Sequence, residues 1–321
     1  MATTKMNCHI CQKKLNNIIT KNLRGGEKRD VYFCSNCELG MLENKQTETG
    51  LKKFYAEEYR TKPNLTSQSK PKELFDTFSP LQANRLKLLL PHFTKKTKLL
   101  EVGCSAGMFL HEARKHVGEI VGIDFDIASA KYAAKKCGCK VYTTEIHETP
   151  LPKKYFDIIV AFQTLEHVSD PKIFISGLKD YLKPGGVLAI EVPNLYDSLA
   201  HIYNLPNHYK FFFHAAHLWY FTEKSLDKLT SSLGFKGKVY HQQDYNILNH
   251  FHWTDADTTD PQSFKRLGPP LLPLRLEKSA KIKKELANFI LNTDEQYKRL
   301  LSKLKITSNI MFIGKNKESH T

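Results

Sequence analysis

Small residues and an acid follow two apolar runs in the segment KLLEVGCSAGMFLHEARKHVGEIVGID, from Lys98 to Asp124. The first run ends at the turn GCSAG (103–107), and the second run ends at Asp124. Glycine reaches backbone torsions that cost other residues energy, and small side chains let a ligand lie against the main chain. The amides of a following helix point at the same place, and an acid after the second strand can accept hydrogen bonds from both hydroxyls of a ribose. These residues predict a site for a nucleoside-bearing cofactor.

The composition of the turn narrows the choice of cofactor. A dinucleotide fingerprint has three glycines in G-x-G-x-x-G, and a phosphate-binding P-loop ends in a lysine and a hydroxyl residue. Here Ser105 takes the place of the second glycine, no third glycine follows at that spacing, and the lysine is missing. With Glu101 two positions before Gly103, the segment resembles the first motif of class I S-adenosylmethionine (SAM) methyltransferases, E/D-x-G-x-G-x-G. Ser105 departs from the usual glycine of that motif.

This resemblance implies an α/β fold with a Rossmann-like sheet of seven strands, of which the last is antiparallel, and SAM as cofactor. Later segments arrive in the family's order: FDIIVAFQTLEHVSDP (156–171) and YLKPGGVLAIEVPN (181–194). Glu101 would lie near the amino acid part of SAM, Asp124 would bind the ribose, and Glu145 and Ile146 would flank the adenine. The remaining implied cofactor residues are Gly103, Cys104, Ser105, Gly107, Phe125 and Gln163. Any other doubly wound fold with continuous apolar strands is the structural alternative.

Two C-x2-C pairs near the amino terminus form a second pattern. Cys8 and Cys11 are separated by 22 residues from Cys34 and Cys37. That spacing is typical of a zinc ribbon, in which four thiolates complete a closed tetrahedral structural site. Disulfides are the alternative. The polar start MATTKMNCHICQKK is no signal peptide and the apolar runs are of strand length, so we expect a cytoplasmic protein without a transmembrane segment, where disulfides are rare.

These patterns divide the chain into a zinc-ribbon domain at 1–50 and a methyltransferase domain at 51–321. We expect helices at 51–60 and at about 79–90. The sixth and seventh strands are expected at 234–248 and 308–316, with the seventh antiparallel beside the fifth, and a helical insertion separates them at about 248–305. Apolar residues recur in this insertion at mostly helical spacing. It is interpreted as an accessory helix packed over the acceptor site or as a homodimer contact.

Histidines with a pKa near neutrality suit proton removal from an acceptor, and they are densest in FFFHAAHLWYFT (211–222). His217 is the candidate base and His214 its assistant. The phrase HLWYFT is similar to the HL-x-x-F-T/S phrase of zinc-containing sugar methyltransferases from polysaccharide and deoxysugar pathways. Sugar C-methyltransferases of that group carry Glu-His before the Leu, whereas this chain has Ala216-His217, which favours a hydroxyl over a carbon acceptor. Packing within the aromatic cluster is the alternative role of both histidines, and His167 of LEHV is a third candidate that also suits a loop-shaping role.

The net charge leaves a second function class open. The chain has 48 Lys and Arg against 33 Asp and Glu, a formal net charge of +15. An RNA methyltransferase that binds through the zinc ribbon and a basic surface is therefore the first alternative, and a non-catalytic SAM-binding partner protein is the second. The lysines are scattered rather than gathered in a stripe. This distribution weighs against RNA, and the resemblance of HLWYFT to sugar methyltransferases implies carbohydrate biosynthesis, with a small-molecule or glycan precursor acceptor that carries phosphate.

Overall fold

In the computed structural model, the structure describes residues 6–15, 17–43, 70–255, 269–270 and 280–316. The helix expected at 51–60 and most of the polar link after it lie outside the described residues, as does the middle of the 248–305 insertion.

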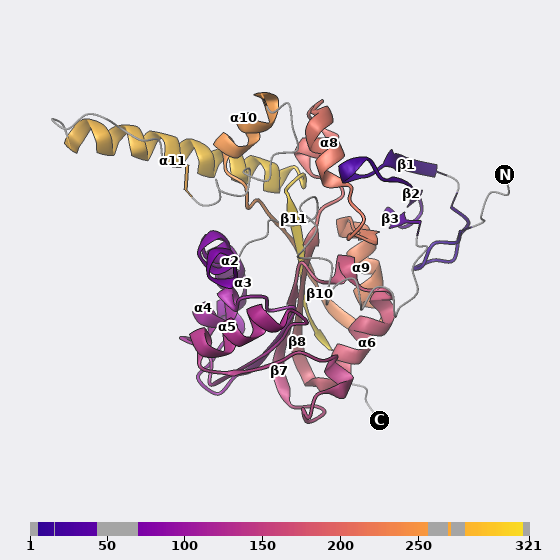
Figure 1. Ribbon diagram of the computed structural model, residues 1–321, viewed down its shortest axis with the longest axis vertical. Helices are drawn as coiled ribbons and strands as arrows, with labels where there is room; N and C mark the ends of the chain where they lie inside the picture. Colours follow the sequence, from indigo (N-terminus) through magenta and orange to yellow (C-terminus); the bar gives the residue numbers. More distant parts are fainter. Residues whose placement is uncertain (1–5, 16, 44–69, 256–268, 271–279, 317–321) are drawn as a thin grey trace.

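A seven-stranded sheet forms the centre of the molecule (Figure 1), in the order β10-β11-β8-β7-β4-β5-β6. Its strands are β4 (Lys98–Val102), β5 (Glu119–Ile123), β6 (Lys140–Tyr142), β7 (Phe156–Phe162), β8 (Leu182–Pro193), β10 (Phe235–Gln242) and β11 (Asn309–Asn316). β4 to β8 pair in parallel, while β11 lies antiparallel between β8 and β10. The predicted sheet, with its last strand antiparallel beside the fifth, is confirmed.

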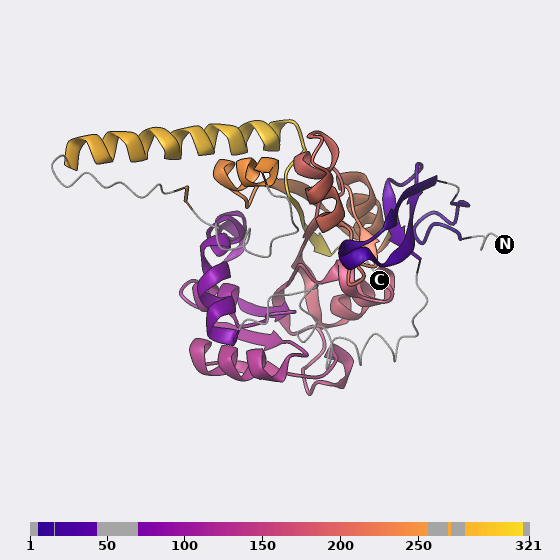
Figure 2. The same ribbon diagram turned by 45° about the horizontal axis from the view of Figure 1, so that its top comes forward.

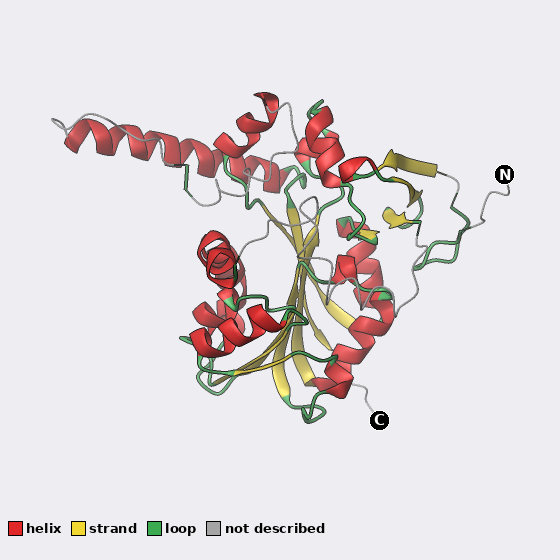
Figure 3. Cartoon of the chain, in the orientation of Figure 1, coloured by secondary structure: helices red, strands yellow, loops and turns green. Residues whose placement is uncertain are grey.

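Helices cover both faces of this sheet (Figure 3) because its strands are apolar on both sides. One face carries α2 (Pro71–Phe78), α3 (Gln82–Leu89), α4 (Met108–Ala113) and α5 (Ile127–Cys137), and the other carries α6 (Pro171–Tyr181) and α9 (Glu223–Ser232). Short 3-10 turns occupy 24–26, 79–81, 90–92, 146–148 and 165–167. The helix expected from residue 79 begins only at Gln82, because Pro80 lies in the 3-10 turn that separates α2 from α3.

The amino-terminal strands form a second, smaller sheet that includes a strand from the carboxyl-terminal half. β1 (Asn17–Asn22), β2 (Lys28–Cys34) and β3 (Leu39–Leu42) are antiparallel neighbours, and β3 pairs with β9 (Trp219–Tyr220). Leu39 and Cys8 belong to the same buried cluster as Phe221 and Leu226. Residues 6–43, which we call the ribbon, therefore share a sheet and a core with the rest of the chain. A boundary at residue 50 stays a prediction, since 44–69 are outside the described residues.

Four further helices surround the upper edge of the large sheet: α7 (Ser198–His201), α8 (Pro206–Phe212), α10 (Ile247–Asp255) and α11 (Ala280–Lys303). Figures 1 and 2 show α11 extending past the body of the protein. Near its carboxyl end Leu301 is buried, whereas Phe289 is 70% exposed. Packing as an accessory helix is thus limited to the last turns of α11. Within the described residues, no helix has both the length and the apolar character that crossing a membrane requires.

Candidate active site

A cavity of about 640 Å³ opens at the carboxyl ends of β4, β5 and β7, and it brings together most of the residues that the sequence singled out. It is lined by nine of the ten implied cofactor residues, namely Glu101, Gly103, Cys104, Ser105, Asp124, Phe125, Glu145, Ile146 and Gln163. His167, His214 and His217 line the same cavity. Gly107 does not line it but begins α4 as its amino-terminal cap. None of the described residues of α10 and α11 lines it, and the middle of the 248–305 insertion lies outside the described residues, so its role over the acceptor stays a prediction.

Left-handed backbone shapes the turn after β4. Gly103 and Gly107 have φ of 79° and 81°, and Ser105 has φ of 46°. The amides of Gly103 and Cys104 donate to the carbonyl of Ile123 at 2.8 and 3.0 Å, which ties the turn to the end of β5. A β-carbon on Gly103 would overlap the hydroxyl of Thr164. Gly103 therefore combines a left-handed torsion with close packing against Thr164, and a larger residue would displace the turn or Thr164.

Asp124 braces this turn from the end of β5. Its carboxylate accepts hydrogen bonds from the amide of Ser105 at 2.6 Å and from the amide of Asp126 at 2.9 Å. A carboxylate has about four acceptor positions, so it can hold the turn and still accept a ribose hydroxyl. The role foreseen for Asp124 is therefore joined by a structural one that the sequence did not reveal.

Glu101 is 4% exposed, and its Oε2 atom has no hydrogen-bond partner in the described structure. Burial raises the pKa of this carboxyl to about 8, an effect that nearby Arg85 opposes and Asp124 reinforces. A cationic ligand would supply the missing partner, and SAM carries a sulfonium and an ammonium group. The residues at this end of the cavity therefore fit SAM.

The raised pKa predicts that SAM affinity depends on pH. The neutral form of Glu101 dominates below about pH 8 in the free protein, whereas a cationic ligand favours the carboxylate, so binding releases a proton. Arg85, Asp124 and Cys139 are the other charged or titratable groups that act on Glu101. We expect affinity to rise roughly tenfold per unit between about pH 6 and pH 8 and then to level off. Calorimetry in buffers of different ionisation enthalpy measures the proton release. A flat wild-type profile, or an unchanged slope in Glu101→Gln, contradicts the prediction.

A polar network that the sequence did not predict lies beneath the cofactor end of the cavity. Arg85 of α3 forms a buried ion pair with Glu191 of β8, with Nε 3.0 Å from Oε1. The amide nitrogen of Gln163 donates to Glu191 at 3.1 Å and to Asn309 at 3.2 Å. Gln163 thus lines the cavity with its amide nitrogen already engaged. The sequence does contain an indication of this network, because Glu191 interrupts an apolar strand and Gln82, Arg85 and Leu89 follow helical spacing. It does not show which of these polar groups pair with one another.

The three candidate histidines converge around Glu166, which the sequence did not place in the site. Glu166 is 1% exposed, and neither of its carboxylate oxygens has a hydrogen-bond partner among the described residues. Its Oε1 atom lies 3.8 Å from Nε2 of His167 and 4.0 Å from Nε2 of His217. The rings of His214 and His217 are 3.7 Å apart between centroids. The cluster comes from two segments: a 3-10 turn at Leu165–His167 and the loop between α8 and β9.

Burial controls the protonation of this cluster. It raises the pKa of Glu166 to about 8, lowers the pKa of His167 to about 4, and holds the pKa values of His214 and His217 well below the ordinary value. The histidines are therefore neutral near pH 7 in the free protein, and a neutral imidazole can accept a proton or bind a cation.

The sulfur atoms of the two C-x2-C pairs lie close together. The sulfurs of Cys8, Cys11, Cys34 and Cys37 lie within 4.8 Å of one another, and none of them is in a disulfide. Both pairs form the same turn: the residue after each pair, Gln12 or Glu38, is left-handed and donates its amide to the carbonyl of the first cysteine. Sulfurs around a tetrahedral zinc ion lie roughly 3.8 Å apart, from a Zn–S distance of about 2.3 Å. The donor set fits zinc.

The ribbon contacts the loops that carry the histidines. His9, which lies between the first two cysteines, is 3.0 Å from the carboxylate of Asp170, just after LEHV. Trp219 of β9 donates its ring nitrogen to the carbonyl of Val168 at 2.7 Å. The hydroxyl of Tyr220, also in β9, accepts from the amide of His214 at 3.1 Å. The ribbon therefore holds β9, and β9 holds both halves of the histidine cluster.

The cavity wall is rich in acids. Its described lining includes the carboxyl groups of Glu101, Asp124, Asp126, Glu145, Glu166, Asp170, Asp197 and Asp244, against the guanidinium groups of Arg24 and Arg85. Arg85 is already paired with Glu191. Burial raises the pKa of Glu101 and Glu166 to about 8 and the pKa of Asp197 and Asp244 to about 7, so only part of this wall is ionised near pH 7. A cationic cofactor would favour the ionised forms.

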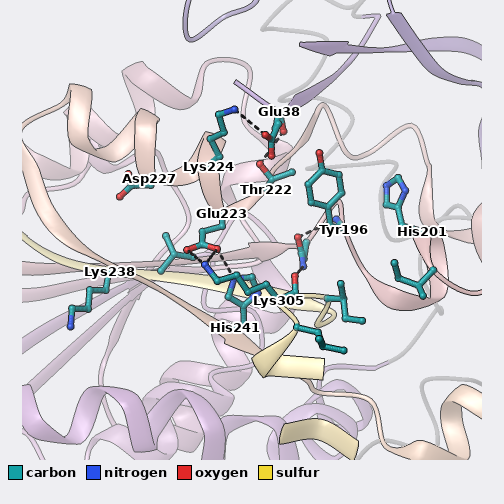
Figure 4. Close-up of a pocket in the computed structure, with 15 residues that line it drawn as sticks. Glu38, Tyr196, His201, Thr222, Glu223, Lys224, Asp227, Lys238, His241 and Lys305 are labelled. Atoms are coloured by element: carbon teal, nitrogen blue, oxygen red, sulfur yellow. Dashed lines mark hydrogen bonds and ion pairs between the residues drawn. The ribbon is translucent and has the colours of Figure 1, made fainter. Parts of the chain in front are cut away.

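A second cavity, of about 960 Å³, lies between β3, α9, β10 and the end of α11 (Figure 4). Glu223 is paired there with Lys305 at 2.8 Å and with His241 at 3.1 Å, and Lys224 is paired with Glu38 at 2.9 Å. None of the predicted site residues lines this cavity. These ion pairs link the ribbon, α9 and α11, and we assign them a structural role.

Comparison with known proteins identifies the family. A model described as a methyltransferase domain matches residues 74–240, more than half of the chain. The chain belongs to this methyltransferase family. Its matched segment contains the turn after β4, Asp124, Glu166 and both predicted histidines of the 211–222 segment.

Individual relatives match a shorter stretch. A ubiquinone biosynthesis O-methyltransferase of Bradyrhizobium sp. (strain ORS 278) is 32% identical over 101 residues, which is 30% of this chain and 40% of that protein. A probable S-adenosylmethionine-dependent methyltransferase of Mycolicibacterium smegmatis is 30% identical over 106 residues, 33% of this chain and 41% of that protein. The methyltransferase chain thus spans about 40% of the length of these curated relatives. Among solved structures, a SAM-dependent methyltransferase from Archaeoglobus fulgidus aligns with 76% of this chain and 97% of its own, at 20% identity and a TM-score of 0.49.

Proposed function

We propose that this protein transfers a methyl group from SAM to a hydroxyl group of a small-molecule acceptor. The observation that carries the proposal is that one cavity is lined both by the turn after β4 and by the three candidate histidines. The name of the Bradyrhizobium relative, an O-methyltransferase, supports a hydroxyl acceptor. The absence of Glu before His217 favours the same choice over a carbon acceptor.

Bound SAM would supply an activated methyl group on a sulfonium. The residues of the chain then have three tasks: Glu101 and Asp124 hold and orient the cofactor, the cavity wall positions the acceptor for in-line displacement, and His217 or His214 removes the acceptor proton. Ser105 and Gly103 supply the close main-chain approach, and zinc bound by the four cysteines would hold β9 and thus the histidines.

A sugar hydroxyl is the acceptor class that we favour, because HLWYFT resembles the phrase of sugar methyltransferases. We propose that a nucleotide-linked or glycan precursor, which carries phosphate, provides this hydroxyl. RNA remains the alternative acceptor, since the net charge of +15 suits it. We also keep a homodimer through α11 as a proposal, because Ile282, Leu286 and Phe289 on that helix are exposed.

The test supplies SAM with a labelled methyl group to the purified protein and a cell extract, followed by size separation and ribonuclease treatment. We expect label in small or ribonuclease-resistant sugar-containing molecules. His217→Gln is expected to lower transfer by roughly 100-fold or more, the range for loss of a general base, without changing SAM affinity. His116→Gln, outside the cavity lining, serves as the matched control. Label in a large fraction that ribonuclease makes small would replace the sugar with RNA.

A further inference from the structure

We propose that Glu166, His167 and His217 bind a divalent first-row transition metal ion, distinct from the thiolate site, to which the acceptor hydroxyl coordinates. This inference rests on the proposed function for its use in catalysis, but the metal site itself does not. Carboxylate and imidazole oxygen and nitrogen atoms are ligands that Zn²⁺, Mn²⁺, Fe²⁺ and Co²⁺ accept. The ligand atoms of these three residues all lie within 4.8 Å of one another.

The unpartnered carboxylate is the first reason. Both oxygens of Glu166 are buried without a hydrogen bond in the described structure, which is costly unless a proton or a cation compensates. At 3.8 and 4.0 Å, the imidazole nitrogens of His167 and His217 are too far away to be hydrogen-bond donors to it. Ligand atoms around a tetrahedral ion at about 2.1 Å are roughly 3.4 Å apart, so small side-chain shifts would complete the coordination.

The orientation of His167 is the second reason. Its Nδ1 atom is 2.8 Å from the carbonyl oxygen of Ala216, and because a carbonyl only accepts, Nδ1 carries the hydrogen. Nε2 then presents its lone pair on the side that faces Glu166. When Glu166 is ionised, its carboxylate and this lone pair repel one another, whereas a cation between them is attracted by both. Proteins commonly orient a metal-bound histidine in this way, by a hydrogen bond from its other ring nitrogen to a carbonyl oxygen.

The two segments that carry the ligands are fixed to one another before any ion binds. The amide of Leu218 donates to the carbonyl of Glu166 at 2.8 Å, and the amide of His217 donates to the carbonyl of His214 at 3.1 Å. Such a preformed site loses little freedom when it binds an ion.

A bound ion would also activate the acceptor hydroxyl for methyl transfer. A divalent ion lowers the pKa of a coordinated hydroxyl, as it does that of water. His217 is then a ligand, and His214, whose Nδ1 has no partner in the described structure, receives the proton. The O–H bond breaks and its proton moves to His214. The oxygen's electron pair forms the new O–CH3 bond as the S–CH3 bond of SAM breaks, and the electron pair of that bond returns to the sulfur, which leaves as the neutral thioether.

The test uses full-length protein with its thiolate site filled by zinc, titrated with Co²⁺ and followed by visible absorption and metal analysis. We expect a second metal ion per chain whose absorption lacks a thiolate-to-cobalt charge-transfer band. Glu166→Gln is expected to weaken its binding at least 100-fold, and Glu295→Gln on exposed α11 should leave it unchanged. Equal Co²⁺ affinity in Glu166→Gln overturns the site. If that variant does not fold, saturation of the wild type at a single metal ion per chain overturns it as well.

Methyl transfer separates this inference from the proposed function. Full transfer by protein that holds only the thiolate-bound zinc would overturn the metal's role and leave O-methylation standing. A second bound ion without methylation of any acceptor would contradict the proposed function while supporting the site. Restoration of transfer by added Co²⁺ or Mn²⁺ after chelation, with thiolate zinc retained, is the expected result.

Discussion

Replacing Gly103 with alanine is expected to lower SAM affinity more than 100-fold. The alanine would have to adopt a φ of 79°, which costs about 1–2 kcal/mol, and its β-carbon would overlap the hydroxyl of Thr164. Thr164 cannot move away cheaply, because its hydroxyl donates to the carbonyl of Phe162 at 3.0 Å. The turn must therefore shift, and with it Ser105 and the Asp124 carboxylate that its amide holds. Calorimetric titration with SAM measures the loss.

Gly138→Ala is the matched control for this substitution. Gly138 ends α5 with a φ of 68°, so alanine meets a similar torsional cost, but nothing lies within 4 Å of the added carbon. We expect the strained torsion to lower the thermal stability of both variants by a comparable amount. The SAM affinity of Gly138→Ala should be unchanged. Similar SAM affinities in both variants would show that the turn at Gly103 does not hold the cofactor.

Loss of the zinc ion that we propose for the four cysteines is expected to reduce methyl transfer by at least 100-fold while SAM affinity changes less than about threefold. Structural zinc supplies about 10–16 kcal/mol of apparent binding free energy that small ribbons need to fold. Without a folded ribbon, β9 loses its pairing with β3, and Tyr220 and Trp219 lose the support that positions His214 and the LEHV loop. The turn at 103–107 is held instead from the large sheet, by the carbonyl of Ile123 and the carboxylate of Asp124. Cys34→Ser tests this expectation, with transfer rate and SAM affinity measured on the same sample.

Two variants make the zinc result specific. Cys139→Ser removes a thiol outside the four-sulfur cluster and should retain the methyl-transfer rate and the SAM affinity of the wild type. Gly40→Ala keeps the four thiols but places a β-carbon 2.9 Å from that of Tyr220, so it should separate β3 from β9 and reproduce the loss of transfer. Full transfer by zinc-free Cys34→Ser would contradict a positioning role for the ribbon.

The sequence predicted the large sheet well because each of its motifs is local. The turn at 103–107, the acid at 124 and the apolar strands each show their roles within a few residues, and their order along the chain implies the strand order. The antiparallel seventh strand followed from the same order even though a long insertion precedes it. The 3-10 turn at Pro80 was missed because helical spacing continues across it.

Pairings between distant segments account for what the sequence did not reveal. β9 has only two residues, and its partner β3 lies about 180 positions earlier in the chain, so no periodicity marks it. Glu166 was interpreted as part of a loop phrase, and only the fold places His217 beside it. The Arg85–Glu191 ion pair joins a helix to a strand 106 positions later. In each case the type of the residue indicated that it has a role, but the sequence did not show which residue is its partner.

Equilibrium binding of SAM to the wild type, Glu101→Ala and Asp124→Ala tests the central claim most directly. We predict one SAM molecule per wild-type chain. A charge-assisted hydrogen bond contributes about 1.5–3 kcal/mol, so each variant should bind roughly 10-fold to 100-fold more weakly. Unchanged affinity in both variants, or no SAM binding by the folded wild type, would contradict the assignment of this cavity to the cofactor.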